Sequence, residues 1–201
     1  MNSLSQIIIA FITGVLGPVL IIIIKNRLDR AKAKPDMLTD SLRIGELVTT
    51  RLDHIREEFK ADRVWITQFH NGGHFYPTGK SIAKFSVIYE TVSINTHSIQ
   101  SNFQNIPVNL FTKSMNRLLD HEIIEVSDFN DEAIATYGLK YVAEDTNCKS
   151  GYLFAIKTLD DKFIGVLGLD YTKKKVKLNS VDINHLSNHA SSLGGALIST
   201  H

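Results

Sequence analysis

The sequence contains only one cysteine, Cys148. A single cysteine excludes an intramolecular disulfide and any redox chemistry that needs a resolving thiol. The net charge of +1, with 21% charged residues, excludes a disordered chain and gives no indication of a nucleic-acid partner. A glycine-rich phosphate loop, a nucleophile elbow and a zinc-protease helix are also missing, so the sequence predicts that the chain is not an enzyme.

The longest uncharged segment predicts a membrane anchor. Residues 4–24 carry no charge, and about 20 apolar residues span a bilayer as a helix. Five basic residues at positions 25, 27, 30, 32 and 34 follow this segment, which favours a cytoplasmic location for the rest of the chain. A cleaved signal peptide or a buried core helix would be the alternatives.

We therefore expect a single-pass membrane protein with its amino terminus outside. Its parts would be a transmembrane helix over 4–24, a basic juxtamembrane linker over 25–36 and a cytoplasmic domain over 37–201.

Periodic patterns in the remaining chain predict one domain of helices and strands. Apolar residues recur at helical spacing over 44–59 and over 183–197, the second stripe following a helix cap at Asn179 or Ser180. Alternating side chains predict strands over 63–69, 82–93, 122–126, 151–158 and 162–171. Further helices are expected after Pro107 and over 131–143. The order predicts an α+β fold with a central antiparallel sheet of about five to six strands, flanked by helices.

Several of these segments together resemble a known family. They are residues 62–66, the helix after Pro107 that leads into 123–128, residues 150–156 and 163–170, and the terminal amphipathic helix. Their order and spacing resemble the successive landmarks of a GAF domain over residues 38–200. The resemblance implies a small-molecule sensor module, which holds its ligand between one sheet face and the helices and loops that cover it. The Asn-Lys-Phe-Asp-Glu motif of the cyclic-nucleotide-binding subset is missing, which argues against cyclic AMP or GMP.

In such a domain, aromatic and polar side chains near the sheet would line the pocket. Aromatic rings stack on flat ligands, and a few polar groups fix the ligand's orientation. The same rings would also fill the core of any covered sheet, so both interpretations stay open. The expected ligand-binding residues are Trp65, Phe69, His70, Asn71, Phe85, Tyr89, Ser127, Asp128, Tyr137, Tyr141 and Tyr152.

The segment from His70 to His74 contains two histidines, one asparagine and two glycines. Asn-Gly and Gly-Gly pairs accept positive φ, which predicts a turn with exposed histidines at the mouth of the pocket. The histidines could contact a phosphate or, with a third ligand, a metal. Two histidines four residues apart share a face only on a helix, however, and the glycines disfavour a helix. We therefore expect no metal site in this segment.

The sequence thus predicts a membrane-anchored sensory or regulatory module that binds a small molecule and signals through a protein partner or the anchor. The alternative is a ligand-free interaction protein that recruits a partner to the membrane. We also expect a homodimer, because the two helical stripes offer more apolar surface than one sheet face covers. The sequence identifies no cofactor.

Overall fold

A computed structural model describes residues 6, 11–31, 37–75, 77–132 and 138–198. The chain divides into two compact units, residues 1–41 and residues 42–201. The first unit contains a π-helix, η1 (Ile12–Leu16), and the helix α2 (Gly17–Ala31). The first residues of the helix α3 (Met37–Glu58) also belong to the first unit.

The prediction of a membrane anchor over 4–24 is wrong. Among the described residues, no helix is both long enough and apolar enough to cross a membrane. The apolar segment is divided between η1, which has five residues, and α2, which has fifteen and includes four charged ones. A spanning helix needs about 20 mostly apolar residues. Part of the predicted segment, 4–5 and 7–10, lies outside the described residues.

The predicted single-pass membrane localisation, with an outside amino terminus and a cytoplasmic domain, depended on that helix and is overturned with it. Residues 25–31, predicted as a linker, belong to α2, while 32–36 lie outside the described residues.

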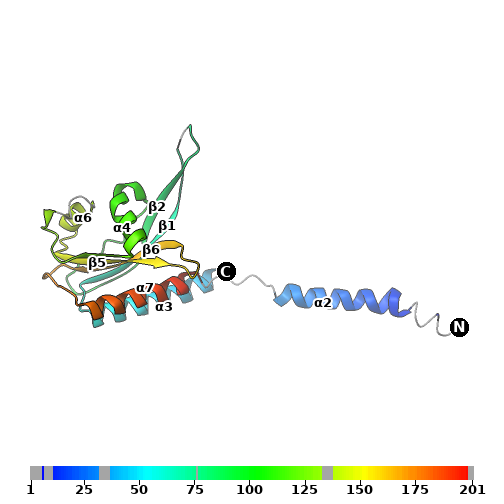
Figure 1. The fold of residues 1–201 in the computed structure, drawn as a ribbon. Coiled ribbons are helices and arrows are strands. Elements are labelled where there is room, and N and C mark those ends of the chain that lie inside the picture. Colours follow the sequence, from blue (N-terminus) through cyan, green and yellow to red (C-terminus); the bar gives the residue numbers. More distant parts are fainter. Residues whose placement is uncertain (1–5, 7–10, 32–36, 76, 133–137, 199–201) are drawn as a thin grey trace. The chain divides into compact units, whose positions relative to one another are not determined.

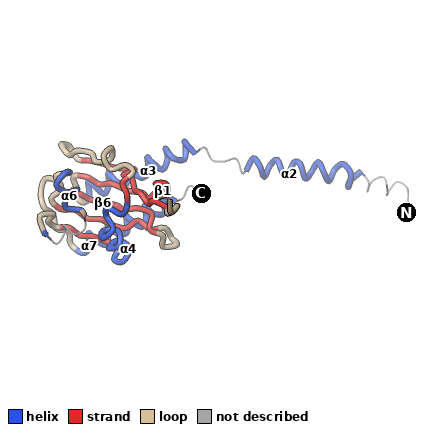
Figure 2. The backbone as a smooth tube through the Cα atoms, turned by 90° about the horizontal axis from the view of Figure 1, so that it is seen from above, coloured by secondary structure: helices blue, strands red, loops and turns tan. Residues whose placement is uncertain are grey.

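The second unit is built on one six-stranded sheet, in which every neighbouring pair of strands is antiparallel (Figures 1 and 2). The strand order is β3-β2-β1-β6-β5-β4. An α+β fold with a central antiparallel sheet of about five to six strands, flanked by helices, was predicted for this part of the chain, and here the prediction is confirmed. The strands are β1 (Arg63–His74), β2 (Ser81–Val92), β3 (Ile106–Pro107), β4 (Ile123–Val126), β5 (Ser150–Lys157) and β6 (Phe163–Tyr171).

Two helices, α3 and α7 (Ser180–Ile198), lie side by side on one face of the sheet (Figure 1). The apolar stripe of α3 is fully buried there at Val48, Leu52 and Ile55, and α7 contributes Leu186 and Leu193 to the same core. The helical stripes that were predicted to form a dimer seam therefore pack against the sheet of their own chain. Dimerisation stays a prediction. The apolar stripes of α3 and α7 no longer support it, because they are covered by the sheet.

Local capping explains where α7 begins and where α3 ends. The side-chain oxygen of Asn179 accepts the N–H of Asp182 at 2.9 Å, which caps the first turn of α7 as predicted. At the end of α3, Lys60 has a positive φ of 51° and the Ala61 N–H bonds to the Arg56 carbonyl at 3.0 Å. This left-handed cap places Glu58 in the last turn of α3.

Shorter helices cover the opposite face of the sheet. They are the 3₁₀-helix η2 (Val108–Phe111), α4 (Thr112–His121) and α6 (Leu139–Asp145). Leu118 of α4 packs there on Ile124, Val126 and Val166 of the sheet.

The predicted turn at His70–His74 is wrong, because these residues belong to β1 and pair with β2. His70 pairs with Lys84, and His74 pairs with Ser81, so these residues continue the strand. The chain reverses beyond them, where Gly79 has a φ of +68° and its N–H bonds to the Phe75 carbonyl at 2.8 Å. Ladder partners on β2 therefore outweigh the turn preference of the glycines.

A bulge in β2 changes which side chains face the covering helices. Ile66 pairs with Tyr89 while the next residue, Thr67, pairs with Val87, so Ile88 is an extra residue in the ladder. An extra residue reverses the alternation of side chains along a strand. Phe85 and Tyr89 therefore face opposite sides of the sheet.

Candidate functional site

A cavity of about 80 Å³ lies between the sheet and the helices α4 and α6. The sheet contributes alternate residues of its strands, because only every second side chain faces this side. Aromatic and aliphatic side chains make up most of the lining. They include Trp65, Phe85, Val87, Ile99, Phe103, Phe111, Met115, Leu118, Phe129, Leu139, Ala143 and Leu153.

One end of the cavity is polar, because Arg63 and Asp170 lie directly opposite each other on β1 and β6. Arg63 Nε donates to Asp170 Oδ2 at 2.7 Å, and Trp65 Nε1 donates to the same oxygen at 2.9 Å. The indole has room to lie there because its cross-strand partner is Gly168, where a Cβ would come within 2.2 Å of the ring.

The guanidinium of Arg63 is buried but incompletely satisfied. Its side chain is 1% exposed, and Nη1 donates to the His97 carbonyl at 3.0 Å. Nη2 is buried and has no hydrogen-bond partner among the described residues. A buried donor left without a partner costs about 1–3 kcal/mol, so an acceptor oxygen beside Nη2 would be stabilising.

A second buried carboxylate, Glu90, lies 4.0 Å from Arg63 Nε. Its oxygens accept the backbone N–H groups of Ile99 at 2.8 Å and Gln100 at 3.1 Å. These bonds attach the loop after β2 to the sheet, and the same loop supplies Ile99 and Phe103 to the cavity wall.

The single cysteine also lines the cavity. Cys148 is buried, and its Sγ donates to the Ser150 carbonyl at 3.2 Å. Burial, followed by the negative charge of Asp170, raises the pKa of the thiol far above its ordinary value. Cys148 is therefore a neutral thiol at physiological pH and a poor nucleophile.

Two of the predicted ligand-binding residues, Trp65 and Phe85, line the cavity. Phe69 lies further along β1 and packs edge to face on Phe163, with ring centroids 4.8 Å apart. His70 is exposed and its Nε2 lies 3.0 Å from the Ser86 hydroxyl.

Four other predicted residues lie on the surface or outside the described residues. Tyr141 is 72% exposed, and Tyr137 falls outside the described residues. Asn71 accepts the N–H of Gly73 at 3.0 Å. Ser127 is exposed.

Asp128 forms an ion pair with Lys175 and accepts the N–H of Asn130 at 2.9 Å. The hydrogen bond from Lys175, followed by the one from Asn130, lowers the pKa of the Asp128 carboxyl. This carboxylate stabilises a loop and does not line the cavity.

Tyr89 and Tyr152 face the opposite side of the sheet and belong to the core beneath α3 and α7. The Tyr152 hydroxyl donates to the Val176 carbonyl and accepts the Leu178 N–H, both at 2.9 Å. The sheet thus separates these two rings from the cavity that contains Trp65.

The polar end of the cavity was missed by sequence reasoning. Arg63 and Asp170 are 107 positions apart, and only the pairing of β1 with β6 brings them together. A usable signal was present, because each is a charged residue that lies directly beside an apolar, alternating strand pattern.

Comparison with solved structures finds GAF domains of photoreceptors. The blue-light absorbing form of the Thermosynechococcus elongatus PixJ GAF domain matches with a TM-score of 0.65 at 16% identity, over 83% of this chain and 91% of that one. A far-red cyanobacteriochrome photoreceptor matches with a TM-score of 0.64 at 16% identity, over 87% and 98%. The phycocyanobilin-bound GAF domain of a cyanobacterial phytochrome matches with a TM-score of 0.62 at 17% identity, over 82% and 89%.

The sequence matches no family model and no curated protein. At identities this low, the structural likeness establishes the fold alone. The arrangement of one six-stranded antiparallel sheet between a helix pair and a cavity-covering helix layer is a GAF-like domain, as the sequence predicted.

Proposed function

We propose that this chain is a sensory or regulatory module that binds a small molecule in the cavity beneath α4 and α6, without catalytic activity of its own. The observation that carries the proposal is an apolar cavity with one polar end, where Arg63 is ion-paired with Asp170 and its Nη2 has no partner among the described residues. Ligand pockets combine an apolar wall with a few polar groups that fix orientation.

The ligand that fits this description is compact, flat and mostly apolar, with one carboxylate or carbonyl oxygen. Aromatic rings such as Trp65 and Phe111 favour a flat body, and a guanidinium favours an anionic or carbonyl oxygen. The cavity of about 80 Å³ is small beside ligand pockets of about 300–1,000 Å³. We therefore propose a ligand smaller than the phycocyanobilin named for one structural neighbour.

We further propose that the output passes to a protein partner or to a second copy of this chain. The sheet places α3 and α7 on the face opposite the cavity, where they are available for contact (Figure 1). Leu42 of α3 is exposed and offers an apolar position for such a contact. Sedimentation of the full chain at micromolar concentration tests for a homodimer, and a strictly monomeric species would leave only the protein partner.

The second candidate is a ligand-free interaction protein. Two observations favour it, namely the small volume of the cavity and the packing of Tyr89 and Tyr152 in the opposite core. The two candidates differ in one respect that can be measured, because only the first requires a ligand beside Trp65.

A cavity-filling variant distinguishes the two functions. Ala143 is 3% exposed and lines the cavity, so Ala143→Leu fills space that a ligand would occupy. Trp65 is the single tryptophan and reports on the cavity by fluorescence. The probes are benzoate, phenylacetate and indole-3-carboxylate, added to the full chain with melting temperature as the second readout.

We expect at least one probe to change Trp65 fluorescence and to raise the melting temperature, since a ligand at 100 times its Kd stabilises by about 2.7 kcal/mol. Ala143→Leu should abolish both signals, whereas Ala83→Leu, at an exposed position of β2, should retain them. If no probe changes either signal, or if Ala143→Leu binds as wild type does, the interaction protein becomes the better account.

A further inference from the structure

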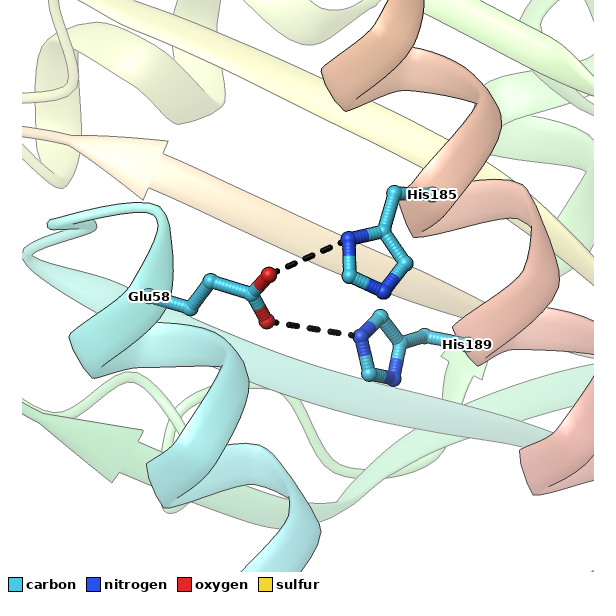
Figure 3. Close-up of side chains that lie close together, drawn as sticks. All are labelled: Glu58, His185 and His189. Carbon is cyan, nitrogen blue, oxygen red and sulfur yellow. Dashed lines mark ion pairs between the residues drawn. The ribbon is translucent and has the colours of Figure 1, made fainter.

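A carboxylate and two imidazoles meet on the face of the sheet opposite the cavity. Figure 3 shows Glu58 of α3 facing His185 and His189 of α7, with both imidazoles on the same side of the carboxylate. Glu58 Oε1 lies 3.1 Å from His185 Nδ1, and Glu58 Oε2 lies 3.6 Å from His189 Nε2. One donor atom from each of the three residues lies within 4.8 Å of the other two.

The local structure fixes this arrangement from both helices. His185 and His189 are four residues apart on α7, so their rings share one face and lie with centroids 4.7 Å apart. Phe59, which is buried, packs edge to face on both imidazoles, with ring centroids 5.8 and 6.4 Å away. Arg51 of α3 donates to the Ser192 hydroxyl of α7, which holds the two helices together one to two turns away.

Hydrogen bonding inside the protein does not account for the position of His189. The His189 side chain is only 11% exposed, and its Nε2 is a buried atom without a hydrogen-bond partner among the described residues. The separation of 3.6 Å from Glu58 exceeds the 2.7–3.2 Å of an N–H···O hydrogen bond. A cation between the three donor atoms would satisfy His189 Nε2 and the carboxylate together.

We propose that Glu58, His185 and His189 form a binding site for a divalent transition-metal ion, with zinc as the best match. Two imidazoles four residues apart on a helix, with a carboxylate from another element, are a ligand set that zinc takes up readily. Zinc binds these ligands at about 2.0–2.2 Å, so tetrahedral donors lie about 3.3 Å apart. The present donor distances require only side-chain adjustments to reach that value.

His185 is 52% exposed, which leaves the fourth tetrahedral position open to a water ligand. His54, one turn before Glu58, lies at the edge of the site with its Nε2 4.0 Å from Glu58 Oε2. A metal held in this way joins the last turn of α3 to the middle of α7. The site is separate from the cavity and does not depend on the proposed function.

The test measures zinc binding to the full chain without an affinity tag. Isothermal titration with zinc chloride should give one site per chain, and cobalt(II) should develop the visible absorption bands of tetrahedral coordination. His185→Gln and Glu58→Gln should each lower zinc affinity at least tenfold, because each removes one ligand. His121→Gln, a substitution of an exposed histidine on α4, should leave the affinity unchanged.

Melting temperatures separate loss of the site from loss of the fold. Zinc should raise the melting temperature of wild type and His121→Gln but not of His185→Gln. Without metal, His185→Gln should melt at the same temperature as wild type, because the His185 side chain is half exposed. Absence of zinc binding to wild type would overturn the proposal. Equal affinity of wild type, His185→Gln and Glu58→Gln would overturn it as well, since the metal would then bind elsewhere on the chain.

Discussion

Two adjacent glycines in α7 allow the packing of this helix on the sheet to be measured. A Cβ at Gly194 would lie 2.1 Å from the Lys157 carbonyl oxygen and 3.1 Å from the carbonyl carbon, whereas at Gly195 nothing lies within 4 Å. The atoms that oppose Gly194 are backbone atoms of β5, so no side-chain rotation relieves the overlap. Gly194→Ala must push α7 away from the end of β5.

Helix propensity and overpacking change the free energy of unfolding in opposite directions. Alanine in a helix interior is favoured over glycine by about 0.8–1.0 kcal/mol, and both substitutions gain up to this amount. Overpacking a close contact costs about 1–3 kcal/mol, and only Gly194→Ala incurs this cost. Gly195→Ala should therefore stabilise the domain by up to about 1 kcal/mol, while Gly194→Ala should be about 1–3 kcal/mol less stable than Gly195→Ala.

Urea unfolding of the full chain, followed by far-ultraviolet circular dichroism, measures both variants against wild type. For a domain of this size, 1 kcal/mol corresponds to about 2–4 °C in melting temperature, so thermal unfolding provides an independent check. Equal stability of Gly194→Ala and Gly195→Ala would refute the inferred close approach of α7 to Lys157.

Two further predictions concern buried groups. Burial opposes ionisation of Asp62, but the side-chain hydrogen bond from Lys173 and two backbone N–H groups lower its pKa overall. The ionised Asp62 carboxylate stabilises the folded chain fully above its ordinary pKa of 3.8, and this stabilisation is lost as the pH falls through the lowered pKa. Asp62→Asn should lower the free energy of unfolding by about 1–3 kcal/mol at pH 7. In urea unfolding, the difference in stability between wild type and Asp62→Asn should become smaller towards pH 3. Because burial raises the pKa of Cys148, Ellman's reagent should label it slowly in the native chain and rapidly in urea; fast native labelling at pH 8 would contradict the buried thiol.

Local patterns predicted most elements of the domain because local forces determine them. The cap at Asn179 and the stripe through Val48, Leu52 and Ile55 depend only on neighbours along the chain, and the structure contains both. The anchor was predicted from hydropathy alone, a property that does not show where each helix begins and ends. The described helices in that region are too short or too charged to span a membrane.

The candidate site was harder to predict because it depends on contacts between distant segments. The extra residue Ile88 reverses the faces of β2, so Tyr89 belongs to the core and Phe85 to the cavity. The polar end of the cavity arises from a strand pairing that no local pattern specifies. The spacing of His185 and His189 is typical of metal ligands on a helix. The sequence alone does not indicate their carboxylate partner, because Glu58 lies on a different helix.

The position of a bound ligand tests the central claim most directly. Carbon-13 methyl spectra of the full chain, titrated with the tightest-binding aromatic carboxylate, locate the ligand by the methyl groups that shift. The account predicts shifts for Val87, Met115 and Leu118, which line the cavity, and none for Leu52 and Leu193, which lie beneath α3 and α7. Shifts confined to Leu52 and Leu193, or the absence of any shift at saturating ligand, would contradict ligand binding beside Trp65.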